Sequence, residues 1–311
     1  YNPGDAATYT LTNVSAAHAL SVSADEGVTN GNARGTMISA AAYAAAVTAD
    51  VTADATLNLT LAATASQTTV ANAARNDALT VTLNGTGDFA INDDGTGATT
   101  SNDIDSLTLV VNGTAARTIA LGADDFNTAL TLTGTQSGAL KVTSVEAVTI
   151  NASAIAGNTT ITLASLTTDD DKVITMGAGD DSVVASAVTI DRDDTIDFGD
   201  GTDSLTVAAL ASAGDLTNSN DEYFENMTSL ETLNLTSGAD VVLDDDAQAA
   251  GIATVNVSGT SASSTVSVQS DYSNALAMTL ASSNTLVLDN DANVATTIVV
   301  ATLAADTTIT G

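Results

Sequence analysis

The stretch that decides the fold is Met176-Gly-Ala-Gly-Asp-Asp-Ser-Val183, which returns 22 residues later as Phe198-Gly-Asp-Gly-Thr-Asp-Ser-Leu205. Both copies read G-x-G-x-D-x-aliphatic. Glycine allows a tight turn that exposes backbone carbonyl oxygens, and aspartate adds a carboxylate at that turn. The aliphatic residue two places later is predicted to point into a core, because side chains alternate along a strand. We therefore expect two stacked turns, each leading into a strand.

Short alternations of apolar residues with threonine surround these turns on both sides. Alternation with a period of two is typical of half-buried strands. The strands recur roughly every 10–25 residues with almost no helical pattern between them, which favours a β-solenoid or a β-sandwich. The alternations after residue 104 are LTLVVNG (107–113), ALTLTG (129–134), AVTINAS (147–153), TTITLAS (159–165), KVITMGAG (172–179), DTIDFGDG (194–201), SLTVAA (204–209), LETLNLTSG (230–238), ATVNVSG (253–259), STVSVQS (264–270), NTLVLDND (284–291) and TTIVVAT (296–302).

Composition decides between these two architectures. Hydrophobic residues make up 44% of the 311, but aromatic residues only 3%, and Trp and Cys are absent. A sandwich needs bulk to fill the ~10 Å between its sheets, whereas the narrow interior of a solenoid is filled by stacked small aliphatic side chains. The sequence therefore predicts an all-β chain with a parallel β-helix or β-roll. The lack of Cys excludes disulfides and thiolate chemistry.

The first hundred residues are less regular. ATYTLTNV (7–14), ALSVSAD (19–25), ATLNLTLAAT (55–64) and ALTVTLNG (78–85) predict strands, whereas the alanine-rich stretch from Met37 to Val47 allows one short helix. We place a boundary near residue 104, after a loop rich in Gly, Asp and Thr. This divides the chain into a β-rich N-terminal region, 1–104, and a solenoid, 105–311.

The net charge of the chain limits the classes of partner that it is expected to bind. With 38 acidic and 6 basic residues the formal net charge is -32, which repels phosphate backbones and anionic lipid, so we expect no nucleic-acid binding. No run approaches the roughly 18 apolar residues of a membrane span, so we expect no membrane insertion. Because the first residue is Tyr1 rather than Met, we interpret the sequence as a processed chain or a fragment.

The acidity consists mainly of aspartate, since only five of the acidic residues are Glu. Aspartate suits both tight turns and hard-cation sites, and each acidic cluster taken singly is open to either interpretation. Repulsion between neighbouring carboxylates would be relieved by a bound cation. None of the clusters forms an EF-hand loop. They lie at Asp93-Asp94, Asp103/Asp105, Asp124-Asp125, Asp169-Asp170-Asp171, Asp191/Asp193/Asp194/Asp197, Asp244-Asp245-Asp246 and Asp289/Asp291.

The two Gly-Asp turns resemble the nonapeptide repeats of RTX proteins, G-G-x-G-x-D-x-aliphatic-x, whose turns bind calcium in a parallel β-roll. By position, Gly177 and Gly199 match the second Gly of that repeat, and Asp181 and Asp203 match its ligand. The leading Gly is replaced by a larger residue, the spacing is 22 rather than a multiple of nine, and only two good copies exist. The resemblance implies one shared ion, separate ions or none.

Combining this resemblance with the adjacent acidic clusters gives a set of candidate Ca2+ ligands within the solenoid, of which Asp181 and Asp203 are the first choice. Asp180 is a second choice, because it should point to the opposite side of the strand from Asp181. The full set is Gly177, Gly179, Asp180, Asp181, Gly199, Asp200, Gly201, Asp203, Asp169, Asp171, Asp194 and Asp197.

Residues of about 145–311 also resemble the repetitive, cysteine-free bodies of bacterial surface-layer (S-layer) and RTX-type surface proteins, through phrases such as GAGDDSVV and DFGDGTDSLTV. The resemblance implies a calcium-dependent structural protein, exported by type I secretion, that self-assembles into a layer on the cell surface. Its partners would be further copies of itself, and a cell-surface polysaccharide or lipopolysaccharide reached through another region. An RTX-type adhesin or fibre segment with a binding tip elsewhere, including a viral one, is the alternative.

Enzyme classes find little support. The chain has one histidine, His18, and no cysteine, which leaves no Ser-His-Asp triad and no His-Glu-x-x-His metal site. Paired carboxylates can cleave sugars, and a β-helical carbohydrate-active enzyme is therefore the remaining enzymatic alternative. The only adjacent aromatic pair, Tyr223-Phe224, is interpreted as packing or as a contact patch. Arg192 lies among aspartates and is predicted to form a local ion pair. We expect a non-enzymatic protein.

Overall fold

The chain is nearly all parallel β-strand and forms a β-solenoid. The computed structural model describes residues 8–11, 20–25, 35–41, 47–52, 56–62, 66–72, 78–83, 88–93, 106–121, 126–164, 170–186, 190, 192–208, 224–236, 241–258, 265–280, 285–288, 298–303 and 308–310. Contacts divide the chain into two compact units, Tyr1–Thr162 and Leu163–Gly311. The predicted fold class is confirmed.

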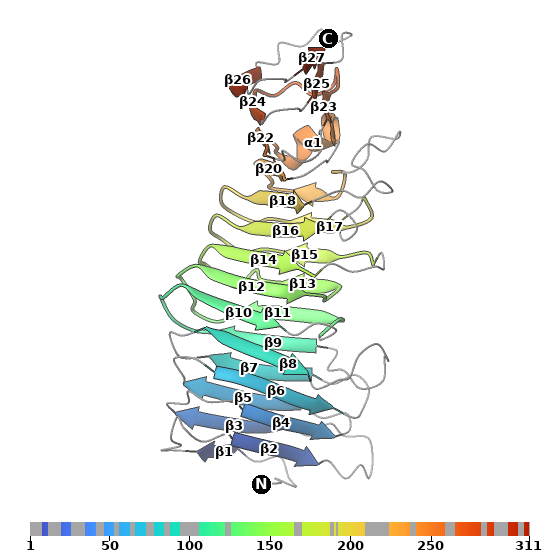
Figure 1. Ribbon diagram of the computed structural model, residues 1–311. Coiled ribbons are helices and arrows are strands. Elements are labelled where there is room, and N and C mark those ends of the chain that lie inside the picture. The colour runs from blue at the N-terminus through green and yellow to red at the C-terminus, as the bar shows by residue number, and fades with distance from the viewer. Residues whose placement is uncertain are drawn as a thin grey trace. The chain divides into compact units, whose positions relative to one another are not determined.

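In the first unit each coil gives one strand to each of two parallel sheets, so a strand pairs with the next but one along the chain (Figure 1). Odd-numbered strands β1 to β13 form one sheet, and even-numbered strands β2 to β14 form the other. The strands are β1 (Thr8–Leu11), β2 (Leu20–Asp25), β3 (Gly35–Ala41), β4 (Val47–Thr52), β5 (Thr56–Ala62), β6 (Ser66–Asn72), β7 (Ala78–Leu83), β8 (Phe89–Asp93), β9 (Ser106–Val111), β10 (Arg117–Leu121), β11 (Ala129–Thr133), β12 (Leu140–Val145), β13 (Thr149–Asn151) and β14 (Thr159–Leu163).

The second unit keeps the same rule with shorter strands. One sheet has the order β15-β17-β19, another β16-β18-β20-β22-β24-β26, and a third β21-β23-β25-β27. Its elements are β15 (Val173–Thr175), β16 (Ser182–Ser186), β17 (Thr195–Asp197), β18 (Ser204–Ala208), β19 (Met227–Thr228), β20 (Thr232–Leu235), β21 (Val241–Leu243), α1 (Asp245–Ala250), β22 (Thr254–Val257), β23 (Thr265–Val268), β24 (Leu276–Leu280), β25 (Thr285–Leu288), β26 (Ile298–Leu303) and β27 (Thr308–Thr310).

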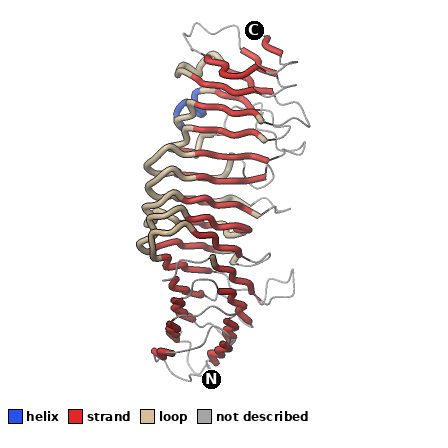
Figure 2. Tube along the Cα trace, turned by 60° about the vertical axis from the view of Figure 1, so that its left-hand side comes forward, coloured by secondary structure: helices blue, strands red, loops and turns tan. Residues whose placement is uncertain are grey.

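The core consists of aliphatic ladders in which like residues stack on adjacent coils. In the first unit Leu130 lies in register with Leu107 and with Ile150, and all three side chains are buried. In the second unit Val183 and Leu205 are paired in register and fully buried, as the repeat pattern predicted. Burying each such side chain contributes roughly 1.5–3 kcal/mol. Figure 2 shows the described loops of each unit stacked like its strands.

The helix allowed from Met37 to Val47 is not formed: β3 covers Gly35–Ala41 and β4 begins at Val47, while 42–46 lie outside the described residues. Pairing of β3 with β1 and β5 outweighs the intrinsic preference of alanine for helix. Near residue 104, β7 and β9 pair directly in parallel, so the same two sheets continue through the predicted boundary, and the division between compact units falls at Thr162/Leu163.

Candidate functional site

The two Gly-Asp turns link β15 to β16 and β17 to β18, and they lie on adjacent coils of the second unit. Their backbones pair directly, because the amide of Gly179 donates to the carbonyl of Asp200 (2.9 Å) and the amide of Asp200 donates to the carbonyl of Gly177 (3.1 Å). The stacking of turns 22 residues apart is confirmed. Met176 and Phe198, which replace the leading Gly of the RTX pattern, are buried core residues.

Two glycines of this corner have no room for a side chain. Gly199 has φ +87°, and a Cβ there would lie 2.0 Å from the carbonyl oxygen of Gly177. Gly201 repeats the arrangement against the carbonyl oxygen of Gly179, also at 2.0 Å. Because neither contact can relax without moving backbone, the close stacking of the turns depends on glycine at these positions.

Buried acids form a column along this corner. The backbone amide of Asp181 donates to Oδ1 of Asp203 (2.6 Å), and the backbone amide of Asp203 donates to Oε2 of Glu231 (2.7 Å). Asp203 and Glu231 thus each accept a hydrogen bond from the coil before, whereas Oδ2 of Asp181 accepts from the amide of Gly177 in its own turn (3.2 Å). Asp181 and Asp203 are buried, and Glu231 is half-buried. We call Asp181, Asp203 and Glu231 the acid column.

Glu231 is absent from the sequence-based candidates. It stands directly before β20, as Asp203 stands before β18, and Ser204 pairs with Thr232. Its spacing from Asp203 is 28 rather than 22 residues, so a search for a fixed repeat misses it. The sequence feature that could have identified Glu231 is an acidic residue directly before an alternating strand pattern.

Asp203 is the most unusual residue of the column. It is fully buried, and its Oδ2 atom has no hydrogen-bond partner among the described residues. Burial raises the pKa of Asp203 from 3.8 to about 6, the amide of Asp181 opposes that shift, and the charges of Asp181, Glu231 and Asp180 add to it. The site therefore holds a carboxylate with one oxygen, Oδ1, bonded to an amide and the other, Oδ2, without a donor among the described residues.

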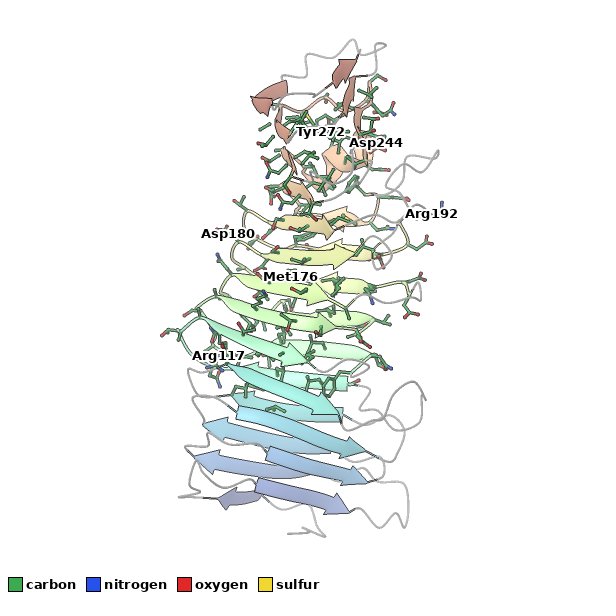
Figure 3. All side chains as sticks on the ribbon, viewed as in Figure 1. Arg117, Met176, Asp180, Arg192, Asp244 and Tyr272 are labelled. Atoms are coloured by element: carbon green, nitrogen blue, oxygen red, sulfur yellow. The ribbon has the colours of Figure 1, made fainter. Side chains whose placement is uncertain are left out.

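The neighbouring acids Asp180 and Asp200 lie outside the column. Both are exposed, and Oδ1 of Asp180 accepts from the amide of Thr202 on the next coil (3.0 Å). Figure 3 shows Asp180 at the outer corner of its coil and Met176 inside it. The prediction that Asp180 and Asp181 point to opposite sides is confirmed by their opposite exposure.

The acids before and after β17 serve other turns. Oδ1 of the buried Asp194 accepts from the amide of Lys172 (2.6 Å), whereas Oδ1 of the exposed Asp197 accepts from the amide of Gly199 and the hydroxyl of Thr228. Asp171 is exposed. Asp169, like Asp191, lies outside the described residues. Nothing in these contacts brings Asp171, Asp194 or Asp197 to the acid column.

Within the described part of the chain, the only three acids whose oxygens all lie within 4.8 Å of one another are Asp244, Asp245 and Asp246. Their role is local: Asp244 is the N-cap of α1, where its Oδ1 accepts from the amide of Ala247 (3.0 Å), and Gly251 ends the helix with φ +109°. The sequence carries the corresponding start and stop signals, with Asp244 before the six helical residues and Gly251 directly after them. This cluster is a helix cap.

Several sequence-based candidates can be placed. Phe224 is buried, which agrees with packing, and Nε of Arg192 lies 3.6 Å from Oδ1 of Asp193 in the expected exposed ion pair. His18, Tyr223 and the acidic positions Asp94, Asp103, Asp105, Asp124, Asp125, Asp289 and Asp291 lie outside the described residues.

The acid column fits a hard cation in donor type. Its available donors are carboxylate oxygens and turn carbonyls, which suit calcium and exclude soft metals. The observation specific to this site is the buried, unpartnered Oδ2 of Asp203, since a cation would supply the missing partner and favour the charged carboxylate.

Comparisons of the chain with protein-family models, with curated proteins and with solved structures give no match. Among the described residues, no helix has the length and apolar character needed to cross a membrane. The evidence on function therefore comes from the chain's own geometry.

Proposed function

We propose that this protein is a calcium-stabilised structural protein of the cell exterior, whose copies self-assemble into a surface layer, and that it is not an enzyme. The observation that carries the proposal is the acid column, and within it the fully buried Asp203 carboxylate with Oδ2 unpartnered. Leaving a buried polar group unsatisfied costs about 1–3 kcal/mol. We infer that this cost is offset by a bound cation, which would pair with the Asp203 carboxylate.

The turn itself does not require these acids. In the first unit the corresponding corners are held by neutral side chains: Oδ1 of Asn112 accepts from the amide of Thr135 (3.0 Å), and Nε2 of Gln136 donates to the carbonyl of Ala115 (2.7 Å). Since amides suffice to close a coil, the carboxylates of the second unit are in excess of what the turn needs. Cation binding accounts for the excess.

Neighbouring pairs of the acid column, Asp181 with Asp203 or Asp203 with Glu231, are the groups that would hold an ion together with carbonyl oxygens of the turn, since the three acids do not all bring oxygens within 4.8 Å of one another. When bound, calcium supplies positive charge that neutralises the stacked carboxylates. A site that exists only in the folded chain, at free calcium 100 times its dissociation constant, stabilises the fold by about 2.7 kcal/mol. Folding is then coupled to a calcium-rich exterior.

A structural role follows from the repeated coil. Three adjacent coils of the second unit present outward polar side chains in register, in the hydrogen-bonded ladder of Thr206, Asn234 and Asn256. A row of polar side chains in register on adjacent coils offers periodic contacts to another copy. Export by type I secretion and attachment to a cell-surface polysaccharide or lipopolysaccharide through another region belong to the same proposal.

The calcium part is tested by titrating the metal-free chain with calcium while following its melting temperature and far-ultraviolet circular dichroism. We expect calcium to raise the melting temperature, and Asp181→Ala and Asp203→Asn to reduce that rise. Asp200→Asn is the matched control, because Asp200 is an exposed acid of the same turn. A melting temperature that ignores both calcium and chelator would end this part of the proposal.

The assembly part is tested by electron microscopy of the purified chain with and without calcium. Ordered two-dimensional sheets that form with calcium and disperse with chelator are the expected result. Separate, unassociated particles at all calcium levels contradict a layer and favour the adhesin or fibre segment instead.

A further inference from the structure

The two sheets of the first unit differ in charge. The chain has 38 acidic and 6 basic residues, yet the seven odd-numbered strands of this unit, β1 to β13, contain none of them. The even-numbered strands of the same unit contain five, which are Asp25, Asp50, Asp93, Arg117 and Lys141. The odd-numbered sheet (Figure 1) is therefore an uncharged sheet in a chain of net charge -32.

The outward side chains of this sheet form rows across the coils. On β9, β11 and β13, buried aliphatic residues alternate with side chains that are half-buried or exposed. Thr131 lies in register with Thr108 on one side and with Asn151 on the other, and Thr133 lies in register with Val110. The outward side chains of these three strands are hydroxyls, one amide and small apolar groups. We call the outward side of the odd-numbered sheet of the first unit the neutral face.

Net charge limits which surfaces of two copies can meet. Two chains of net charge -32 repel each other, and like charges that face each other across an interface oppose association further. Outward carboxylates at a contact would also lose their water. The neutral face avoids both costs at the contact, because its described outward side chains carry no charge. It is therefore suited to contact between copies of this chain.

The spacing of the rows favours a second copy as the partner. Adjacent strands of a sheet lie about 4.8 Å apart, so each row of the neutral face repeats at that distance. A second copy presents the same rows at the same distance. The side chains of two facing sheets can then interdigitate along the whole contact, as they do in the dry interfaces between paired sheets of identical stacked strands.

The size of the sheet sets the expected strength of the contact. Strands about 4.8 Å apart that rise ~3.3 Å per residue give these seven strands an area of roughly 500 Å² on each copy. A pair of copies then buries about 1,000 Å² in total, which is at the lower limit of specific protein interfaces. We therefore expect a weak, reversible contact.

We propose that two copies of this chain associate face to face through the neutral face of the first unit. This contact deepens the self-assembly put forward as the proposed function, and it rests on that function. A two-fold contact of this kind closes on itself and gives dimers. An ordered layer then needs a second kind of contact, such as the ladder of Thr206, Asn234 and Asn256 in the second unit.

The first test is sedimentation velocity of the full chain at constant calcium, over a range of chain concentrations and at low and high sodium chloride. We expect reversible dimers whose population rises with salt, because salt screens the repulsion between the two net charges and leaves an uncharged contact in place. Dimers that dissociate as salt rises would indicate a contact made by ion pairs, and would overturn the neutral face as the interface.

Charge placed on the neutral face locates the contact. Thr131→Asp, in the middle of β11, and Thr149→Asp, at an exposed position of β13, should each weaken dimerisation at least about tenfold. Thr143→Asp is the matched control and should leave dimerisation unchanged, because Thr143 is a half-buried, outward threonine of the even-numbered strand β12. Since Thr149 is exposed, its variant tests the contact even if Thr131→Asp fails to fold.

The outcomes separate this contact from the proposed function. Dimers that both Asp variants of the neutral face retain overturn the contact, while calcium-dependent sheets in the electron microscope would still support the layer. Dimers that only these two variants lose, without sheets, support the contact and contradict the layer. A chain that stays monomeric at every salt and concentration overturns the contact too, and a cellulose pull-down that Thr149→Asp abolishes would then assign the face to a neutral polysaccharide.

Discussion

In both units side chains at the turns hydrogen-bond to the backbone of an adjacent coil, but the first unit uses amides and the second uses carboxylates. In the first unit, the turns after β9 and β11 are held by the amide side chains of Asn112 and Gln136. In the second, the turns after β15 and β17 are held by the carboxylates of Asp181, Asp203 and Glu231. Asn112 and the carboxylates of Asp203 and Glu231 accept from backbone amides of an adjacent coil, whereas Gln136 donates to a backbone carbonyl of an adjacent coil.

Glycine is the element that the two kinds of corner share. A Cβ on Gly138 of the first unit would lie 2.5 Å from the carbonyl oxygen of Thr114, and one on Gly199 of the second would lie 2.0 Å from that of Gly177. The comparison teaches that close stacking needs glycine in both units, whereas charge is added only where Asp and Glu replace the amides. Charge is therefore the difference between the two units on which the proposed calcium binding depends.

The largest expected effect tests the shared element. Gly199→Ala and Gly138→Ala should each destabilise their own unit by about 3 kcal/mol or more, because backbone must move to admit the methyl group. Hydrogen exchange of the affected unit measures the loss, with Ala178→Ser at an exposed position as the control. A well-tolerated Gly199→Ala would show that the turns stack less closely than described.

Calcium removal comes next in size and separates the two units. Chelation should lower the free energy of opening of the second unit by about 2.7 kcal/mol per site that was filled at 100 times its dissociation constant, and leave the amide corners of the first unchanged. Hydrogen exchange read separately around β10–β12 and β16–β20 measures both responses at once. Equal responses in the two regions would contradict the assignment of the calcium site to the second unit.

A smaller effect of opposite sign is expected from Asp203→Asn without calcium. Removing the buried charge should stabilise the metal-free chain at pH 7 by about 1 kcal/mol, since amide oxygen still accepts from Asp181. The pKa of Asp203 is raised to about 6 in the folded chain, so the folded state holds a proton that the unfolded state releases between about pH 4 and 6. The contribution of this group to stability therefore falls as pH rises through that window and then stays level.

The pH dependence supplies the control for this prediction. At pH 5 Asp203 is mostly protonated, so the advantage of Asp203→Asn should shrink, and calcium affinity of the unchanged chain should fall below about pH 6 because the ligand must be deprotonated. Denaturant unfolding at pH 5 and 7, with and without calcium, measures both. A stabilisation by Asp203→Asn that is the same at both pH values contradicts the buried-charge explanation.

The smallest effect concerns the acids that serve a helix. Asp244→Ala removes the N-cap of α1 and should cost about 1 kcal/mol, while the calcium response of the second unit stays intact. Thermal unfolding at fixed calcium, followed by a calcium titration, checks the two parts separately. If Asp244→Ala removes the calcium response, the cation site lies at this cap and the acid column is the wrong location.

Most of the fold, and two of the three residues of the acid column, could be predicted from the sequence. Strand alternation and the scarcity of aromatic residues were enough for the solenoid, and Asp181 and Asp203 were recognised from one motif. Glu231 was missed because an insertion changes the spacing, and the stretch from Met37 was allowed a helix because alanine favours one locally. Pairing with neighbouring coils, which decides both cases, depends on residues tens of positions away.

What the sequence alone determined is the period-two pattern, the two glycine-aspartate turns and the excess of negative charge. These are local or summed properties, and each can be read from neighbouring residues. Only the tertiary structure decided which acids form the acid column and which acid caps a helix. It also decided that Nε and Nη2 of Arg117 are buried without a hydrogen-bond partner among the described residues. Register between coils sets these outcomes, because it fixes which side chain meets which backbone group across a distance that the sequence does not encode directly.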